Sequence, residues 1–257
     1  FDGEQVHLSL AANPSHLEAV DPVVVGKVCA KKRQRGDKER RKVLGLLMHG
    51  DAAFGGQGIV AETFGLSDIK GYRTGGTIHV VVNNQIGFTT VPRRARSSPH
   101  PSDVAKGYGA PIFHVNGDDP EAVVRACRLA VAYRAEWRAD VVVNLVCYRR
   151  YGHNEQDDPS ITLPLRSKAI ENHPRVVDVF ARKLVAAGDI AEEEVERWRR
   201  ETDEKFRAEH AGAAAHVESP EDWVVSSWKR PVSHRDSALN GEVIDAESHS
   251  AAAAAEI

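Results

Sequence analysis

Apolar runs alternate with helical periodicity from about residue 42 to residue 150, which is the pattern of a parallel α/β sheet. The runs short enough to be strands are Val43–Gly50, Gly75–Gln85, Ala110–Gly117 and Asp140–Arg150. A continuous apolar run indicates a strand that is covered on both faces. The pattern therefore predicts an α/β fold with an open, mainly parallel sheet and flanking helices.

The connections between these strands predict the helices. A Gly-rich turn after the first strand leads to a helix near Gly58–Leu66, and a second helix follows Asp118–Glu121, which supplies an N-cap and a proline for the first turn. In this second helix, apolar side chains recur at spacings of three and four: Ala122, Ala126, Leu129, Ala130, Tyr133 and Trp137. We expect that face to pack against the sheet.

Other segments set the predicted domain limits. Val6–Leu10 is strand-like, and Gly87–Tyr108 is a long loop of the kind that is often functional. After the α/β domain, residues 1–174, two helices at Val176–Ala187 and Glu192–Ala208 predict a helical hairpin, residues 175–210. Alanine, serine and acidic residues then dominate, which predicts a linker or irregular tail, residues 211–257.

Composition excludes several classes of protein. The chain has 257 residues with 42% hydrophobic and 28% charged residues, as globular proteins do, and a formal net charge of −3. No apolar run approaches the roughly 18 residues that span a bilayer, so no membrane partner is expected. The basic run Lys31–Lys42 has no aromatic residue and reads as a solvated connection, so no nucleic-acid partner is expected. The three cysteines lack the spacing of a disulfide framework or a zinc site.

Polar residues follow three of the predicted strands, where an open parallel sheet binds its ligands. Asp51 follows the first strand, Asn84 the second, and Arg149 and His153 the last. An aspartate and an asparagine that converge at one edge offer oxygen ligands to Mg²⁺. The alternative is that Asp51 only caps a helix and Asn84 only belongs to a turn.

Phosphate groups fit the same edge of the sheet. The main-chain amides of Ala52 and Ala53 lie at a turn that leads into a helix, a place suited to phosphate. Arg149 and His153 add positive hydrogen-bond donors from the last strand end.

The segment from Gly50-Asp51 to Asn83-Asn84 resembles the thiamine-diphosphate motif, in which a Gly-Asp-Gly precedes an Asn-Asn by about thirty residues. In that family the aspartate, the second asparagine and the main-chain carbonyl two residues later bind magnesium. The resemblance places these roles on Asp51, Asn84 and Ile86. Ala52 stands where the general motif has its second glycine.

Longer stretches resemble the E1 components of 2-oxoglutarate dehydrogenases, whose motif itself carries that alanine. They are HGDAAFGGQGIVAET, NNQIGFTT, APIFHVNGDDPEAV and VCYRRYGHNEQD, within a resemblance that runs from about Val6 to Pro164. It implies the thiamine-diphosphate-binding fold, with thiamine diphosphate and Mg²⁺ as cofactors. His100 and Leu163 depart from the usual pattern of the family, which puts only the details of their loops in doubt.

The resemblance also implies an activity and partners. Such enzymes decarboxylate 2-oxoglutarate and pass the succinyl group to the lipoyl group of an E2 succinyltransferase, in the tricarboxylic acid cycle, and they act as homodimers. His16 falls on an active-site histidine, while Arg149 and His153 fall on residues at the diphosphate. The family's upstream histidine and its downstream domain with a catalytic glutamate do not occur in this sequence, so the chain looks like an excised piece that is inactive alone.

Three alternatives stay open at this point. One is an E1 component for another 2-oxo acid, such as 2-oxoadipate. Another is a nucleotide-binding α/β module, which requires a G-x-G-x-x-G turn that the sequence lacks. The third is a non-catalytic scaffold, against which the presence of Asp51 and Asn84 argues. The expected location is the cytoplasm for a bacterial source and the mitochondrial matrix for a eukaryotic one.

Overall fold

The computed structural model of the chain describes residues 6–154, 156–213 and 215. The chain forms two compact units, Phe1–Ala186 and Ala187–Ile257. The first unit holds the sheet and all the residues of the candidate site.

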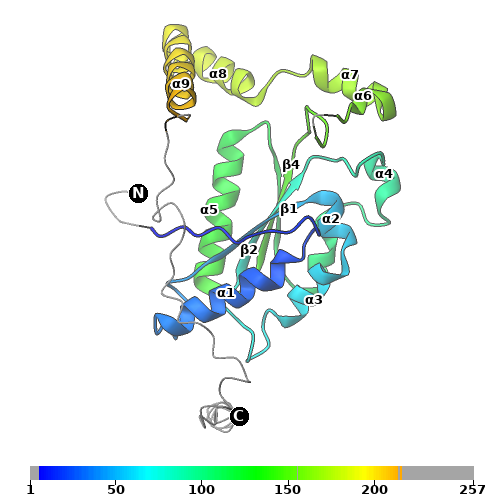
Figure 1. The fold of residues 1–257 in the computed structure, drawn as a ribbon, viewed down its shortest axis with the longest axis vertical. Helices are drawn as coiled ribbons and strands as arrows, with labels where there is room; N and C mark the ends of the chain where they lie inside the picture. Colours follow the sequence, from blue (N-terminus) through cyan, green and yellow to red (C-terminus); the bar gives the residue numbers. More distant parts are fainter. Residues whose placement is uncertain (1–5, 155, 214, 216–257) are drawn as a thin grey trace. The chain divides into compact units, whose positions relative to one another are not determined.

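The first unit is built on a four-stranded, all-parallel sheet with the strand order β1-β2-β4-β3 (Figure 1). The strands are β1 Gly45–Gly50, β2 Thr77–Asn83, β3 Ile112–Asn116 and β4 Val141–Val146. The register pairs Gly50 with Val82, and Asn83 with Val146. The carboxyl ends of β1, β2 and β4 therefore lie level at one edge, and the predicted parallel sheet is confirmed.

Helix α5, Pro120–Trp137, packs against one face of the sheet. Asp119 caps it by accepting a hydrogen bond from the Ala122 amide, as the sequence predicts. Its buried side chains join a core of apolar residues from the strands: Ile78, Val115, Ala126, Ala130, Val141 and Val143. The predicted apolar face was too wide, because Leu129 and Trp137 point away from the sheet and are 56% and 68% exposed.

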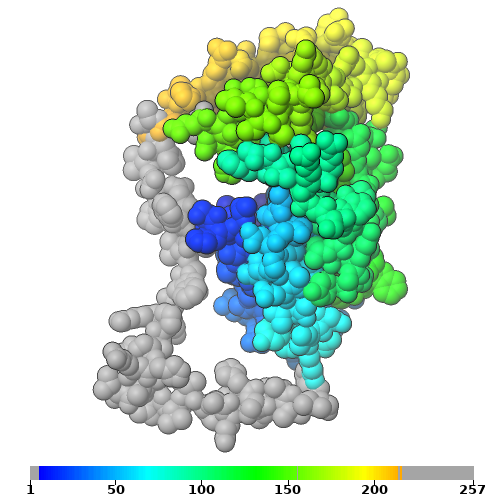
Figure 2. Space-filling model, turned by 90° about the vertical axis from the view of Figure 1, so that its right-hand side faces the viewer, coloured from blue at the N-terminus to red at the C-terminus, as the bar shows by residue number. Residues whose placement is uncertain are grey.

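The other face of the sheet carries helices α1 Val20–Gln34, α2 Asp51–Gly56 and α3 Gly58–Leu66, together with the 3₁₀ helix η1 Pro101–Tyr108. Their core is apolar and fully buried: Phe54, Val60, Phe64, Val81, Ala105 and Val142. Helix α1 contacts both β1 and α3, and Figure 2 shows the blue N-terminal segment against the cyan segment. The sequence missed α1, and it predicted a turn where α2 forms.

The remaining helices are α4 Pro92–Ala95, α6 Pro159–Thr162, α7 Pro164–Asn172, α8 Val176–Ala187 and α9 Glu192–Ala213. The two predicted C-terminal helices are confirmed, although α9 extends beyond residue 208. The predicted strand at Val6–Leu10 was wrong, because these residues pair with no strand and their apolar side chains are exposed. Apart from residue 215, the predicted tail beyond α9 lies outside the described residues.

In the described part of the chain, no helix combines the length and the apolar character that crossing a membrane requires.

Candidate functional site

Asp51 lies at the carboxyl end of β1, where extended backbone at Gly50 turns directly into α2. Its side chain is only 2% exposed. One carboxylate oxygen, Oδ2, accepts a hydrogen bond from the Arg96 guanidinium at 2.7 Å. The other, Oδ1, is buried and has no hydrogen-bond partner in the structure. A buried carboxylate oxygen without a donor fits the ligand set of a hard cation.

The carboxyl end of β2 leads into a tight turn at Asn84, Gln85 and Ile86. The Asn84 amide donates to the Val82 carbonyl at 2.8 Å, and the Ile86 amide donates to Asn84 Oδ1 at 3.3 Å. Gln85 adopts left-handed backbone with φ 62° and donates its side-chain amide to the Cys147 carbonyl at 2.9 Å. The turn is thus fixed both within itself and to the end of β4.

Asn83, the last residue of β2, holds a second orphaned atom. Its side chain is 6% exposed, and its Oδ1 is buried without a hydrogen-bond partner. Each strand end therefore carries one unpaired buried oxygen: Oδ1 of Asp51, itself a predicted magnesium ligand, and Oδ1 of Asn83, which precedes the predicted ligand Asn84.

Ala52 connects the two strand ends. A Cβ atom built on Gly87 would lie 3.2 Å from Ala52 Cβ, so the turn after β2 lies against the first residues of α2. Ala52 is exposed, whereas Ala53 is buried. The structure thus brings the Asp51 helix and the Asn84 turn together, as the strand spacing predicts.

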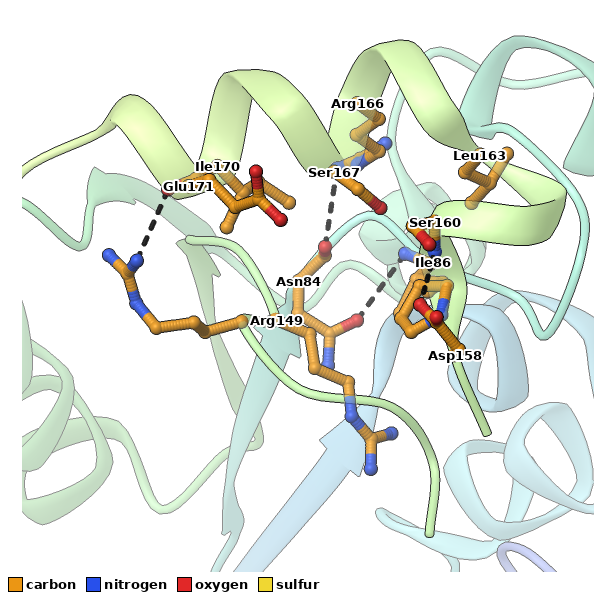
Figure 3. Close-up of a pocket in the computed structure, with 12 residues that line it drawn as sticks. Asn84, Ile86, Arg149, Asp158, Ser160, Leu163, Arg166, Ser167, Ile170 and Glu171 are labelled. Carbon is orange, nitrogen blue, oxygen red and sulfur yellow. Dashed lines mark hydrogen bonds between the residues drawn. The ribbon is translucent and has the colours of Figure 1, made fainter. Parts of the chain in front are cut away.

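A pocket opens beside the Asn84 turn (Figure 3). Its lining includes Asn84, Ile86, Arg149, Ser160, Arg166 and Ile170. Arg166, from α7, donates from Nη2 to the Asn84 carbonyl at 3.3 Å. Burial lowers the pKa of the Arg166 guanidinium, and the negative charge of Asp51 opposes that shift. Arg166 therefore interacts electrostatically with Asp51 and donates a hydrogen bond to Asn84.

Arg149 and His153 occupy different positions. Arg149 lines the pocket with Asn84, and its guanidinium donates to the His153 carbonyl at 3.0 Å. His153 has an exposed side chain, and its main-chain amide donates to Asp157 Oδ2 at 2.9 Å. The structure thus brings Arg149 to the pocket and leaves the His153 imidazole at the surface.

His16 lies in an exposed turn immediately before α1, where its carbonyl accepts a hydrogen bond from the Ala19 amide at 3.2 Å. Two residues later, Glu18 is buried, and its Oε2 lies 2.5 Å from His49 Nδ1 on β1. The segment that carries His16 is therefore joined to the strand that leads to Asp51.

Sequence reasoning missed four side chains of this region: Glu18, His49, Arg96 and Arg166. A signal for Arg96 was available, because the long loop after β2 carries three arginines in a short span, at residues 93, 94 and 96. Their positive charges suit phosphate oxygens. No sequence signal pairs Glu18 with His49, since 31 residues separate them.

Comparisons with known proteins show what this chain is similar to. The family model described as "Dehydrogenase E1 component" matches residues 3–221. The chain is 52% identical over 237 residues to proteins named "2-oxoglutarate dehydrogenase E1 component" from Brucella ovis, Brucella canis and Brucella abortus. That similarity covers 89% of this chain and 24% of each relative, so the chain spans about a quarter of the length of these relatives.

The family match covers most of the chain and includes both strand ends of the site. Members of this family depend on thiamine diphosphate. The chain belongs to the dehydrogenase E1 component family.

Proposed function

We propose that this chain is the diphosphate-binding part of an E1 component that decarboxylates 2-oxoglutarate with thiamine diphosphate and Mg²⁺. One observation carries the proposal: the start of α2, which begins at Asp51, lies against the turn that carries Asn84, and both Asp51 Oδ1 and Asn83 Oδ1 are buried without a donor. The similarity to proteins named 2-oxoglutarate dehydrogenase E1 component supports the choice of substrate.

The Mg²⁺ ligands in this proposal are Asp51 Oδ1, the Asn84 side chain and the Ile86 carbonyl. All three would offer oxygen, the ligand atom that Mg²⁺ prefers, and the cofactor's phosphates and water would supply its further ligands. Asn84 Oδ1 accepts from the Ile86 amide within the turn, so the two residues are held in one fixed arrangement.

The diphosphate is held by positive groups around the same edge. The amides of Ala52 and Ala53 point from the first turn of α2, and Arg149 contributes its guanidinium from the pocket. His153 adds a donor from the exposed loop. When bound, thiamine diphosphate would supply the electron sink that decarboxylation of a 2-oxo acid requires.

His16 orients the 2-oxo acid or holds a proton beside it. Its exposed imidazole can both donate and accept a hydrogen bond, which suits either role. In this proposal the succinyl group passes to a lipoylated E2 succinyltransferase within the tricarboxylic acid cycle, and the working enzyme is a homodimer in the cytoplasm or the mitochondrial matrix. The isolated chain is inactive, because the family's further catalytic groups do not occur in its sequence.

The test uses the full-length parent enzyme, with reduction of an artificial electron acceptor by 2-oxoglutarate as the readout. We expect wild-type activity to require both thiamine diphosphate and Mg²⁺. Asp51→Ala removes a metal ligand and should lower kcat/KM by at least about 100-fold, since even groups beyond the ligands cost about 10 to 100-fold. Asp189→Ala, an exposed aspartate in the second unit, is the matched control and should retain full activity.

Two outcomes would contradict the proposal in different ways. If a folded wild-type enzyme binds thiamine diphosphate but turns over 2-oxoadipate better than 2-oxoglutarate, only the assignment of the substrate is wrong. An Asp51→Ala enzyme with wild-type Mg²⁺ dependence overturns the metal site.

A further inference from the structure

Four titratable side chains form a buried cluster between α1 and the first two strands: Glu18, Asp21, His49 and His79. Their residues are 7%, 2%, 3% and 2% exposed, respectively. Buried ionisable groups are costly unless they pair with one another. The cluster lies on the α1 side of the sheet, next to the aromatic rings of Phe54 and Phe64.

Both ring nitrogens of His49 are used within this cluster. His49 Nδ1 lies 2.5 Å from Glu18 Oε2, and His49 Nε2 lies 3.0 Å from His79 Nδ1. Burial lowers the pKa of His79 well below its usual value, so His79 is the neutral partner. A histidine held at both nitrogens has a fixed ring orientation and tautomer.

Asp21 completes the charge balance. Burial, together with the neighbouring Glu18 carboxylate, raises the pKa of Asp21 to about 8. The shift favours the protonated carboxyl group, which adds no second negative charge beside Glu18. Asp21 Oδ2 lies 3.9 Å from His49 Nδ1, farther than Glu18 does.

The distances argue against a metal ion between these groups. Two atoms that both bind one zinc at about 2.0 to 2.1 Å in a tetrahedron lie about 3.3 Å apart. The separation of 2.5 Å between His49 Nδ1 and Glu18 Oε2 is that of a direct, charge-assisted hydrogen bond. The pair is a link between two segments of the chain.

The link joins the two segments that carry the proposed site. Glu18 follows His16 by two residues, and His49 precedes Asp51 by two residues. Glu18 has left-handed backbone with φ 69°, which is unfavourable for a residue with a Cβ. Such a conformation persists where surrounding contacts enforce it, and the buried contact to His49 is one such constraint.

We propose that the Glu18–His49 pair is a positioning device that fixes the His16 turn relative to Asp51, so that substrate and cofactor groups meet in one geometry. Neither residue touches the reacting atoms in this proposal, which rests on the proposed function. Loss of the pair leaves the metal ligands in place after the ends of β1 and β2 and frees the turn that carries His16.

The test uses the full-length enzyme with Glu18→Gln, His49→Gln and the double variant. Glu18→Gln should lower kcat/KM for 2-oxoglutarate by about 10-fold, as expected for a charged hydrogen bond, and leave half-saturation by Mg²⁺ within about two-fold. The double variant should lose no more than the more severe single variant, because the two residues act as one unit.

Two further variants separate positioning from stability. Glu18→Gly suits the left-handed backbone, which offsets part of the stability lost with the buried carboxylate, and it should lose the same 10-fold in kcat/KM. Asp37→Asn changes another buried carboxylate, 3% exposed, which accepts hydrogen bonds from the Arg41 and Lys42 amides. It should lower the melting temperature and leave kcat/KM within about two-fold, as a purely structural change does.

The outcomes distinguish the two proposals. If wild-type enzyme is active and folded Glu18→Gln and Glu18→Gly both keep wild-type kcat and KM, only the positioning role is overturned. The same holds if the losses of the two single variants multiply in the double variant. If wild-type enzyme neither binds thiamine diphosphate nor oxidises 2-oxoglutarate, the proposed function fails and the positioning role fails with it.

Discussion

The two halves of the candidate site are built in different ways. In the first half, Asp51 is buried and paired with Arg96. It directly follows β1, which pairs with β2 in a continuous register. After β4, Arg149 and His153 lie in a loop, and the hydrogen bonds that hold them include one to a main-chain carbonyl and one from a main-chain amide. The half proposed for the metal is therefore set by the sheet, whereas Arg149 and His153, which are proposed to hold the diphosphate together with the α2 amides, are set by a loop.

This difference follows from the chemistry that each half is proposed to perform. Octahedral Mg²⁺ coordination tolerates little error in ligand position, so its ligands belong on rigid elements. A diphosphate offers many oxygens, so donors on a loop can reach it in several arrangements. Substitutions in the first half should therefore change stability and metal binding together, and substitutions in the second half should change cofactor affinity alone.

The largest effect is expected for Arg96→Met in the full-length enzyme. Removing the guanidinium leaves the Asp51 carboxylate buried without its 2.7 Å partner, which should cost about 3 kcal/mol. Mg²⁺ should restore part of that loss by supplying a cation that binds the folded state. Melting temperatures with and without Mg²⁺ measure both effects. Arg94→Met, an exposed arginine of α4, is the control, and equal melting temperatures for both variants would refute the prediction.

Asp21→Asn should change the pH dependence of stability. Because the folded chain raises the pKa of Asp21 from 3.8 to about 8, it favours the neutral carboxyl group, and this group costs increasing stability as pH rises from about 4 to 8. The melting temperature of Asp21→Asn relative to wild type should rise over that range and level off above it. A difference that is constant with pH would mean that Asp21 stays ionised.

His153→Ala tests the exposed half. The imidazole is at the surface, so its removal should leave the melting temperature unchanged. Loss of one hydrogen-bond donor to the diphosphate should weaken binding of thiamine diphosphate by about 10-fold, which isothermal titration calorimetry measures. His210→Ala, an exposed histidine of α9, is the control. A fall of several degrees in melting temperature would show that this half is as rigid as the first.

The smallest effect is expected for Asp119→Ala, which belongs to neither half. Loss of the N-cap of α5 should cost about 1 kcal/mol, and cofactor affinity should not change. Asp119→Asn keeps a capping oxygen and should retain wild-type stability. A change in cofactor affinity for Asp119→Ala would show that both halves of the site respond to the stability of the whole unit. The proposed difference between the two halves would then be wrong.

The sequence predicted the strands well because their signal is local. A continuous run such as Val141–Val146 can be buried on both faces only within a parallel sheet of this kind. Asp119 and Pro120 marked the start of α5 for the same reason, since capping depends on neighbouring residues. Helix α1 was missed because its apolar residues do not form one clear stripe.

The candidate site likewise has features that a local sequence pattern predicts and features that it does not. The sequence by itself determined that Asp51 and Asn84 end neighbouring strands, and spacing of residue types was enough for this. Only the tertiary structure decided that Arg96 pairs with Asp51 and that Glu18 pairs with His49, over separations of 45 and 31 residues. Such contacts depend on how loops and helices pack across the sheet, and no local pattern records that packing.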